Sequence, residues 1–208
     1  MHSKAGAILK ITFDWNCLIE VQDQRPQARD VLQLVEMHRK GEVEVAMLAA
    51  SASENNASRQ LPGSSAVFEK RRQELGWEDL PLVPMVKVWG LSYWGFSSYP
   101  ADSEAFKRDF DAIWHAIAPN CERNWKSYLT DKQAAIDNAI QSKPLAKWRN
   151  TWCDVMSAYS HINAKRDVFV TLNTRDFQRN SERLAELGMG KIRDPRTLVN
   201  ELTSSLKF

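Results

Sequence analysis

The stretch Arg166–Phe177, RDVFVTLNTRDF, decides the fold class and indicates where a functional site would lie. Its centre, Val168–Val170, is a short continuous apolar run, which is typical of a buried strand in a parallel sheet. Small polar and acidic residues follow it at once, at Thr171, Asn173 and Asp176. Ligands of open α/β sheets bind at the carboxyl ends of the strands, so this crowding predicts a site where the strand ends.

Strands and helices alternate along the rest of the chain. Three further strands are predicted: a short buried run at residues 7–13, a stretch at 42–49 that alternates and then turns apolar, and a last short strand at 191–193. Helices are predicted between the strands, including one that ends at Gly41, one that runs from Pro144 to Asn163 and one that begins at Pro195. This order implies a parallel sheet with helices on both faces, so the predicted fold class is α/β.

The interval 60–143 departs from this alternation. Prolines and glycines interrupt its first half and helices are predicted in its second half. We therefore expect a single domain over residues 1–208 that contains an irregular and helical inserted subdomain. Five aromatic residues of the irregular part are candidates for stacking on bases or on a partner: Trp89, Tyr93, Trp94, Phe96 and Tyr99.

Composition limits the classes of partner. The net charge of the 208 residues is only +2, so a nucleic-acid surface would be a local patch. No stretch approaches the ~18–20 apolar residues that span a bilayer, so no membrane contact is expected. The three cysteines are far apart and odd in number, which argues against a zinc site and a disulfide framework and favours a reduced, cytoplasmic setting.

Oxygen-bearing side chains follow three of the predicted strands. Asp14 comes directly after the first strand, Glu54 after the second, and Asn173 and Asp176 after the third. Asp154 lies in the middle of the helix before the third strand and reaches the same edge if that face packs on the sheet. Because the carboxyl ends of parallel strands share one edge, these side chains are expected to converge.

Such a cluster favours a hard divalent cation, Mg²⁺ or Mn²⁺, since clustered carboxylates repel one another and these ions prefer oxygen ligands. A cation held there lowers the pKa of a bound water and neutralises charge on a phosphodiester, which suits phosphodiester hydrolysis. Each acid also has a structural interpretation. Asp14 and Glu54 could be helix caps, Asp176 a turn residue, and Asp154 part of a buried ion pair.

The combination resembles the PIN-domain family, whose members are mostly metal-dependent ribonucleases. The matching segments are ITFDWNCLIE (11–20), Glu54, CDVMSAYSHINAKRDVFVTLNTRDF (153–177) and GMGKIRDPRTLVNEL (188–202). In the longest match, the family's helix Asp falls on Asp154, its Thr-x-Asp on Thr171-x-Asn173, and its Asp-Phe on Asp176-Phe177. The resemblance covers about the first sixty and the last sixty residues, and the interval 60–143 has no counterpart in a minimal PIN domain.

The resemblance implies a three-layer α/β/α fold and a Mg²⁺- or Mn²⁺-dependent nuclease, most simply an endoribonuclease. Asp14, Glu54 and Asp154 would hold the metal, with Asp176 as a further ligand, and Asn173 would complete the catalytic set. Asn173 stands where the family has a fourth acid, so the site carries one negative charge less. Candidate substrate-contacting residues are Asn16, Thr171, His161 and Arg175, and the cations Lys70, Arg71, Arg72 and Arg179 are further candidates for phosphate contact.

Other interpretations stay open. His161 is alternatively a structural histidine, and the basic residues are alternatively solvated surface charge. The protein could be a weak or inactive PIN-like scaffold that binds RNA or a protein partner, which Asn173 and the insertion favour. A phosphatase of the haloacid-dehalogenase type needs a second Asp where Asn16 stands. A receiver domain needs an acidic pair near the first strand, which this sequence lacks. The expected partners are RNA, an inhibitor or antitoxin protein, and a second copy in a homodimer.

Overall fold

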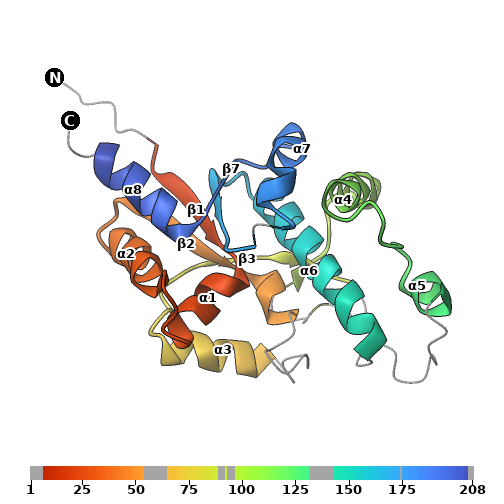
Figure 1. The fold of residues 1–208 in the computed structure, drawn as a ribbon, viewed down its shortest axis with the longest axis horizontal. Coiled ribbons are helices and arrows are strands. Elements are labelled where there is room, and N and C mark those ends of the chain that lie inside the picture. Colours follow the sequence, from red (N-terminus) through yellow and green to blue (C-terminus); the bar gives the residue numbers. More distant parts are fainter. Residues whose placement is uncertain are drawn as a thin grey trace.

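Five parallel strands form the central sheet in the order β3-β2-β1-β6-β7. Their bounds are Leu9–Phe13 for β1, Val43–Leu48 for β2, Leu82–Val83 for β3, Val168–Val170 for β6 and Lys191–Arg193 for β7. The computed structural model describes residues 7–53, 65–88, 92, 97–131, 143–173 and 175–205, which Figure 1 shows as ribbon. The predicted α/β class and central parallel sheet are confirmed.

Helices cover both faces of this sheet, so the architecture has three layers, α/β/α (Figure 1). One face carries α1 (Trp15–Gln22), α2 (Ala28–Arg39), α3 (Ser65–Glu74) and α8 (Pro195–Ser205). The other face carries α4 (Ser103–Ile117), α5 (Trp125–Asp131), α6 (Lys143–Asn163) and α7 (Ser181–Glu186). None of the helices in the described ranges is long and apolar enough to cross a bilayer.

Side chains that alternate along each strand divide the core into two clusters. In β6, Val168 and Val170 belong to the cluster under α2 and α8, whereas Phe169 belongs to the cluster under α6. All three residues are at most 2% exposed, which explains why β6 reads as an uninterrupted apolar run. Strand β1 is the centre of this arrangement because it pairs in parallel with both β2 and β6.

The described residues of the interval 60–143 contribute to the central sheet and to the helical layers on both of its faces. Helix α3 and strand β3 join the main sheet and its core, where Phe68, Trp77 and Leu80 are at most 1% exposed. Beyond them, β4 (Met85–Val86) pairs with β5 (Ser97–Ser98), and α4 and α5 pack against α6. Tyr99 is 74% exposed, as a stacking residue would be, and the other four aromatic candidates, Trp89, Tyr93, Trp94 and Phe96, lie outside the described residues.

Both edges of the sheet are short and obstructed. Strand β3 has two residues and lies between Pro81 and Pro84. At the other edge, Lys191 N–H and the Arg193 carbonyl bond toward β6, so the backbone of Ile192 faces outward. The Arg193 side chain covers that backbone: its Nη1 donates to the Ile192 carbonyl at 2.9 Å and its Nε donates to Glu201 at 2.7 Å.

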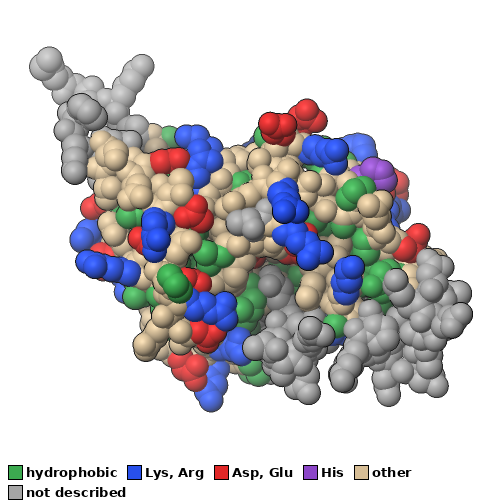
Figure 2. All heavy atoms as spheres, viewed as in Figure 1, with side chains coloured by type: hydrophobic (Ala, Val, Ile, Leu, Met, Phe, Trp, Pro, Cys, Tyr) green, Lys and Arg blue, Asp and Glu red, His purple; other side chains and the backbone are tan. Residues whose placement is uncertain are grey.

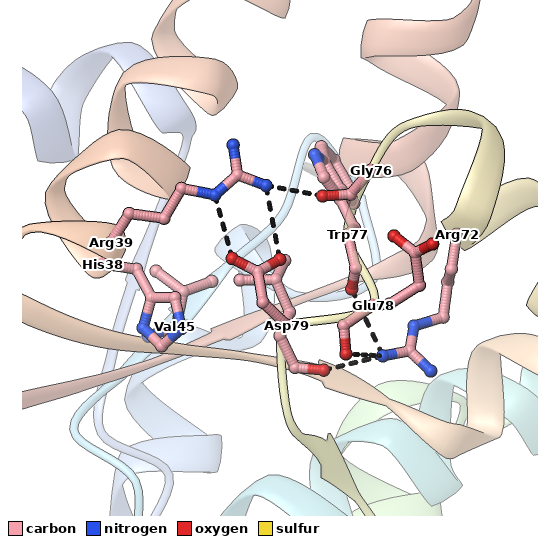
Figure 3. A network of polar contacts seen from close by, with 9 residues as sticks. His38, Arg39, Val45, Arg72, Gly76, Trp77, Glu78 and Asp79 are labelled. Carbon is pink, nitrogen blue, oxygen red and sulfur yellow. Dashed lines mark hydrogen bonds and ion pairs between the residues drawn. The ribbon is translucent and has the colours of Figure 1, made fainter.

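A buried arginine fixes the loop between α3 and β3 (Figure 3). Arg72 is 6% exposed, and its Nη2 donates to the carbonyls of Trp77 at 3.2 Å and Leu80 at 2.7 Å. Its Nη1 pairs with Glu69 at 2.9 Å. Arg39 of α2 holds the same loop from outside through a two-pronged contact with Asp79, but its side chain is 44% exposed. Arg72 therefore replaces the backbone partners that this irregular segment lacks.

We expect Arg72→Met to lower the free energy of unfolding by roughly 3 kcal/mol, because buried carbonyl oxygens lose their donor. Arg39→Met is the matched control, with an expected loss of about 1 kcal/mol or less, since exposed ion pairs contribute little. Urea denaturation of both variants provides the measurement. Equal losses of unfolding free energy in the two variants would show that the buried Arg72 does not stabilise the loop more than the exposed Arg39 does.

Candidate active site

Asp14 lies where β1 ends and α1 begins, and its side chain is bound from several directions. Its backbone N–H donates to the Val170 carbonyl of β6 at 3.0 Å, which places the exits of β1 and β6 side by side. Asp14 Oδ1 accepts from the Trp15 N–H at 2.8 Å and so caps α1. Asp14 Oδ2 accepts from Asn16 Nδ2 and from Thr171 Oγ1, each at 2.7 Å.

Thr171 is the centre of this hydrogen-bond network. Its hydroxyl donates to Asp14 and accepts from the backbone N–H of Asn173 at 2.9 Å and from Asn16 Nδ2 at 3.2 Å. Asn16 Oδ1 in turn accepts from the backbone N–H of Leu172 at 3.0 Å. Asn16 and Thr171, which we expected to contact substrate, therefore hold the Asp14 carboxylate in place.

Asn173 and Asp176 form a second, adjoining pair. Asn173 Oδ1 accepts from the Asp176 backbone N–H at 3.1 Å, and Asn173 Nδ2 donates to Asp176 Oδ2 at 3.0 Å. Asn180 Nδ2 donates to the Asp176 carbonyl at 3.0 Å. These bonds fix the Asp176 carboxylate beside the exit of β6, and the Asn173 amide occupies one of its oxygens.

Asp154 of α6 faces the same place. Burial raises its pKa well above the ordinary carboxyl value, and the negative charges of Asp14 and Asp176 raise it further, against a lowering hydrogen bond with Asn173. Burial also raises the pKa of Asp14, whereas hydrogen bonds from Thr171, the Trp15 backbone and Asn16 lower it. Three carboxylates from separate segments thus lie close enough to repel one another.

Within the described part of the chain, no Lys, Arg or His forms an ion pair with Asp14 or Asp154. The same residues contain no group of three or more His, Cys, Asp or Glu side chains that could hold a metal ion. The donor chemistry still fits Mg²⁺ or Mn²⁺, because these ions accept a few carboxylate oxygens and keep several waters. Asp14 and Asp154, with Asp176 beside them, could hold such an ion partly through water.

The other predicted site residues fall in different places. Glu54 lies outside the described residues, and the short helix η1 (Ala49–Ser53) ends immediately before it. Arg175 is exposed. His161 is 0% exposed, its Nδ1 lies 2.9 Å from Thr12 Oγ1, and its ring packs edge-on against Phe169.

The environment of His161 favours its structural interpretation. Burial, followed by the nearby charge of Arg166, lowers its pKa to about 4, so the imidazole is neutral at pH 7. Nε2 has no hydrogen-bond partner among the described residues. A neutral, enclosed imidazole between α6 and β1 stabilises the core and is not placed to contact a phosphate.

The three basic residues at 70–72 lie in different environments. Arg72 is buried and structural, as described above, and Lys70 is exposed beside Glu74. The Arg71 guanidinium lies 5.3 Å from the centre of the Trp15 ring. Arg71 therefore places a positive charge beside the first turn of α1. On the face that Figure 2 shows, basic and acidic side chains are interspersed.

Comparisons of the chain with protein-family models, with curated proteins and with solved structures found no match. The resemblance to PIN domains accordingly stays a prediction from the residues quoted above.

We expect Asp154→Asn to stabilise the metal-free protein at pH 8 by more than the ~0.5 kcal/mol typical of a surface substitution, because the amide removes a charge that burial and the charges of Asp14 and Asp176 disfavour. The raised pKa means that the folded state keeps its proton longer than the unfolded state as the pH rises, so this group costs stability at high pH. The gain should vanish near pH 3, where Asp154 is protonated in both states. Urea denaturation in EDTA across this pH range measures it.

Asp109→Asn on α4 is the matched control, because Asp109 is exposed and pairs only with neighbouring Arg108 among the described residues. Its effect should stay within about 0.5 kcal/mol at both pH values. A loss of stability in Asp154→Asn at pH 8 would contradict the repulsion inferred from the geometry.

Thr171→Val should destabilise the protein by roughly 1–3 kcal/mol, because Asp14 loses a donor and the Asn173 N–H loses its acceptor. Thr171→Ser keeps the hydroxyl and should lose less. Chemical denaturation distinguishes the two, and a loss in Thr171→Ser as large as that in Thr171→Val would contradict the role of the hydroxyl, because serine retains it.

Proposed function

We propose that the protein is a Mg²⁺- or Mn²⁺-dependent nuclease of the PIN type that acts as an endoribonuclease. The observation that carries the proposal is the meeting of Asp14, Asp154 and Asp176, without an ion-pair partner for Asp14 or Asp154 among the described residues. Mutually repelling carboxylates at the carboxyl edge of a parallel sheet are costly to keep and are typical of functional sites.

The network around Asp14 supports a ligand role. A carboxylate offers about four lone-pair positions, and Asp14 uses three of them for Trp15, Asn16 and Thr171. The remaining position would be directed by these bonds, which prepare the carboxylate before any ligand arrives. Asn173 orients Asp176 in the same manner. Glu54 is the expected further ligand from the second strand.

A divalent cation held by Asp14 and Asp154 would supply the positive charge that neutralises a phosphodiester and promotes its attack by water. The chain's own residues would bind and orient the substrate around it. Arg71, beside the first turn of α1, and Arg175, on the exposed turn after β6, are the cations proposed to position phosphates. Contacts of this kind fix the register of an RNA without reading its sequence.

The proposed setting is the cytoplasm, where Cys17, Cys121 and Cys153, which form no disulfide, would stay reduced. An inhibitor or antitoxin protein and a second copy of the chain remain the proposed protein partners.

The direct test is incubation of labelled single-stranded RNA with the protein and Mn²⁺. Asp14→Asn and Asp154→Asn should each slow cleavage by roughly 100-fold or more, the scale of losing one group that stabilises transition-state charge. Asp109→Asn should cleave like the wild type, and EDTA should stop cleavage. Equal rates for wild type and the two site variants, or cleavage in EDTA, would reject the proposal.

A second candidate function is a PIN-like scaffold that binds RNA or a protein without cleaving. The contact of Asn173 Nδ2 with Asp176 favours it, because an amide donor takes an oxygen that a metal would use. Calorimetric titration with Mn²⁺ separates the two functions. A nuclease site should give heat that Asp154→Asn abolishes, and binding should tighten as the pH rises, because the metal displaces protons from carboxylates with raised pKa values.

A further inference from the structure

A pocket of about 330 Å³ lies between α4, α5 and α6, away from the carboxylates. Six aromatic side chains dominate its lining: Phe106, Phe110, Trp114, Trp125, Trp148 and Trp152. Four of them are buried, whereas Phe106 and Trp125 are half-buried and so form its accessible walls. Apolar and aromatic lining with a few polar groups is typical of a small-ligand site.

The buried rings hold the segment that carries the polar part of the pocket. Trp114 Nε1 donates to the Cys121 carbonyl at 2.9 Å, and Trp148 Nε1 donates to the Glu122 carbonyl at 3.0 Å. The two indoles lie 5.7 Å apart, centre to centre. The segment that follows, with Arg123 and Lys126, is therefore fixed relative to the aromatic floor.

The polar groups of the lining are positively charged or neutral. Lys126 Nζ lies 5.7 Å from the centre of the Trp125 ring, and the Arg123 guanidinium lies 5.9 Å from that of Phe110. Arg123 also pairs with Asp111, which lies outside the lining. No acidic residue is among the described lining residues. An aromatic pocket with cations at its wall suits a flat aromatic group attached to an anion, which is the chemistry of a nucleotide.

Helix α6 connects this pocket with the carboxylates. Trp148 and Trp152, one helical turn apart, line the pocket, and Asp154 follows on another face. Lys147 is exposed and Asp154 partly exposed, seven residues apart, which corresponds to about 10 Å along the helix axis. A short single strand could therefore follow α6 from the carboxylates to the pocket, passing Lys147.

We infer that this pocket binds one base of a single-stranded RNA whose backbone continues to the carboxylate site. The base stacks on Trp125, and the adjoining phosphate contacts Lys126. The choice of an RNA strand over a free nucleotide rests on the proposed nuclease function. The pocket thus gives the nuclease a binding position remote from the cleaved bond.

Binding is measured in EDTA by fluorescence anisotropy with a labelled oligoadenylate RNA, so that no cleavage is needed. Trp125→Ala should weaken binding at least about fivefold, the lower end of the loss of one stacked base. Trp125→Phe retains a stacking ring and should bind within about threefold of wild type, since most of the stacking surface remains. Tyr99→Ala is the matched control, because Tyr99 also carries a lysine, Lys87, over its ring but lies outside the lining.

Lys126→Gln gives an independent measurement that does not remove an aromatic ring. It should lower the dependence of log affinity on log salt concentration by roughly 0.7, the slope for one phosphate contact on a single strand. Wild-type affinity and salt dependence in both Trp125→Ala and Lys126→Gln would overturn the inference. AMP that binds as tightly as the RNA, and equally depends on Trp125, would overturn the assignment to a strand.

The two proposals can fail separately. Binding in EDTA that depends on Trp125, together with RNA that stays intact in Mn²⁺, would reject the nuclease and keep the pocket. Cleavage that depends on Asp154 but not on Trp125, with unchanged RNA affinity in Trp125→Ala, would reject the pocket and keep the nuclease.

Discussion

The hydrogen bond from Thr171 Oγ1 to Asp14 Oδ2 is the contact on which the site depends. It joins the residues that follow the two central strands, β1 and β6, which are 157 residues apart in sequence. Because Thr171 also receives the Asn173 N–H, the same hydroxyl sets the direction of the segment that carries Asp176. Sheet pairing brings the segments together, and this one polar group decides how their side chains face.

The site is unfavourable for stability because it keeps a poorly solvated carboxyl group, that of Asp154, on α6. Asp154 is carried by a helix whose remaining face is packed with aromatic side chains, so its charge is poorly solvated and is repelled by Asp14. A structural role would be served better by an uncharged residue in this position. A carboxylate there is consistent with a site that keeps stability low locally so that a cation or a proton can bind.

Much of the fold could be predicted because β1, β2 and β6 are mainly apolar stretches bounded by polar residues. Strand β3 could not, since two residues between Pro81 and Pro84 show no periodicity. The proximity of Asp14 and Asp176 follows from parallel topology and could be anticipated, whereas that of Asp154 depends on which face of α6 packs on the sheet. The bonds of Asn16 and Thr171 could not, because they depend on side-chain directions. His161 lies one heptad after Asp154, yet is enclosed because α6 passes over β1 at that end.

The two ends of the sheet limit how copies of this protein can associate. At β7, Arg193 fills the hydrogen-bonding position of the outward-facing Ile192 carbonyl, and at the other end β3 offers only two residues between prolines. Among the described residues, neither edge strand of the central sheet therefore offers a neighbouring molecule a long row of open backbone groups. Extension of the central sheet from one copy of the protein into another is disfavoured at both edges.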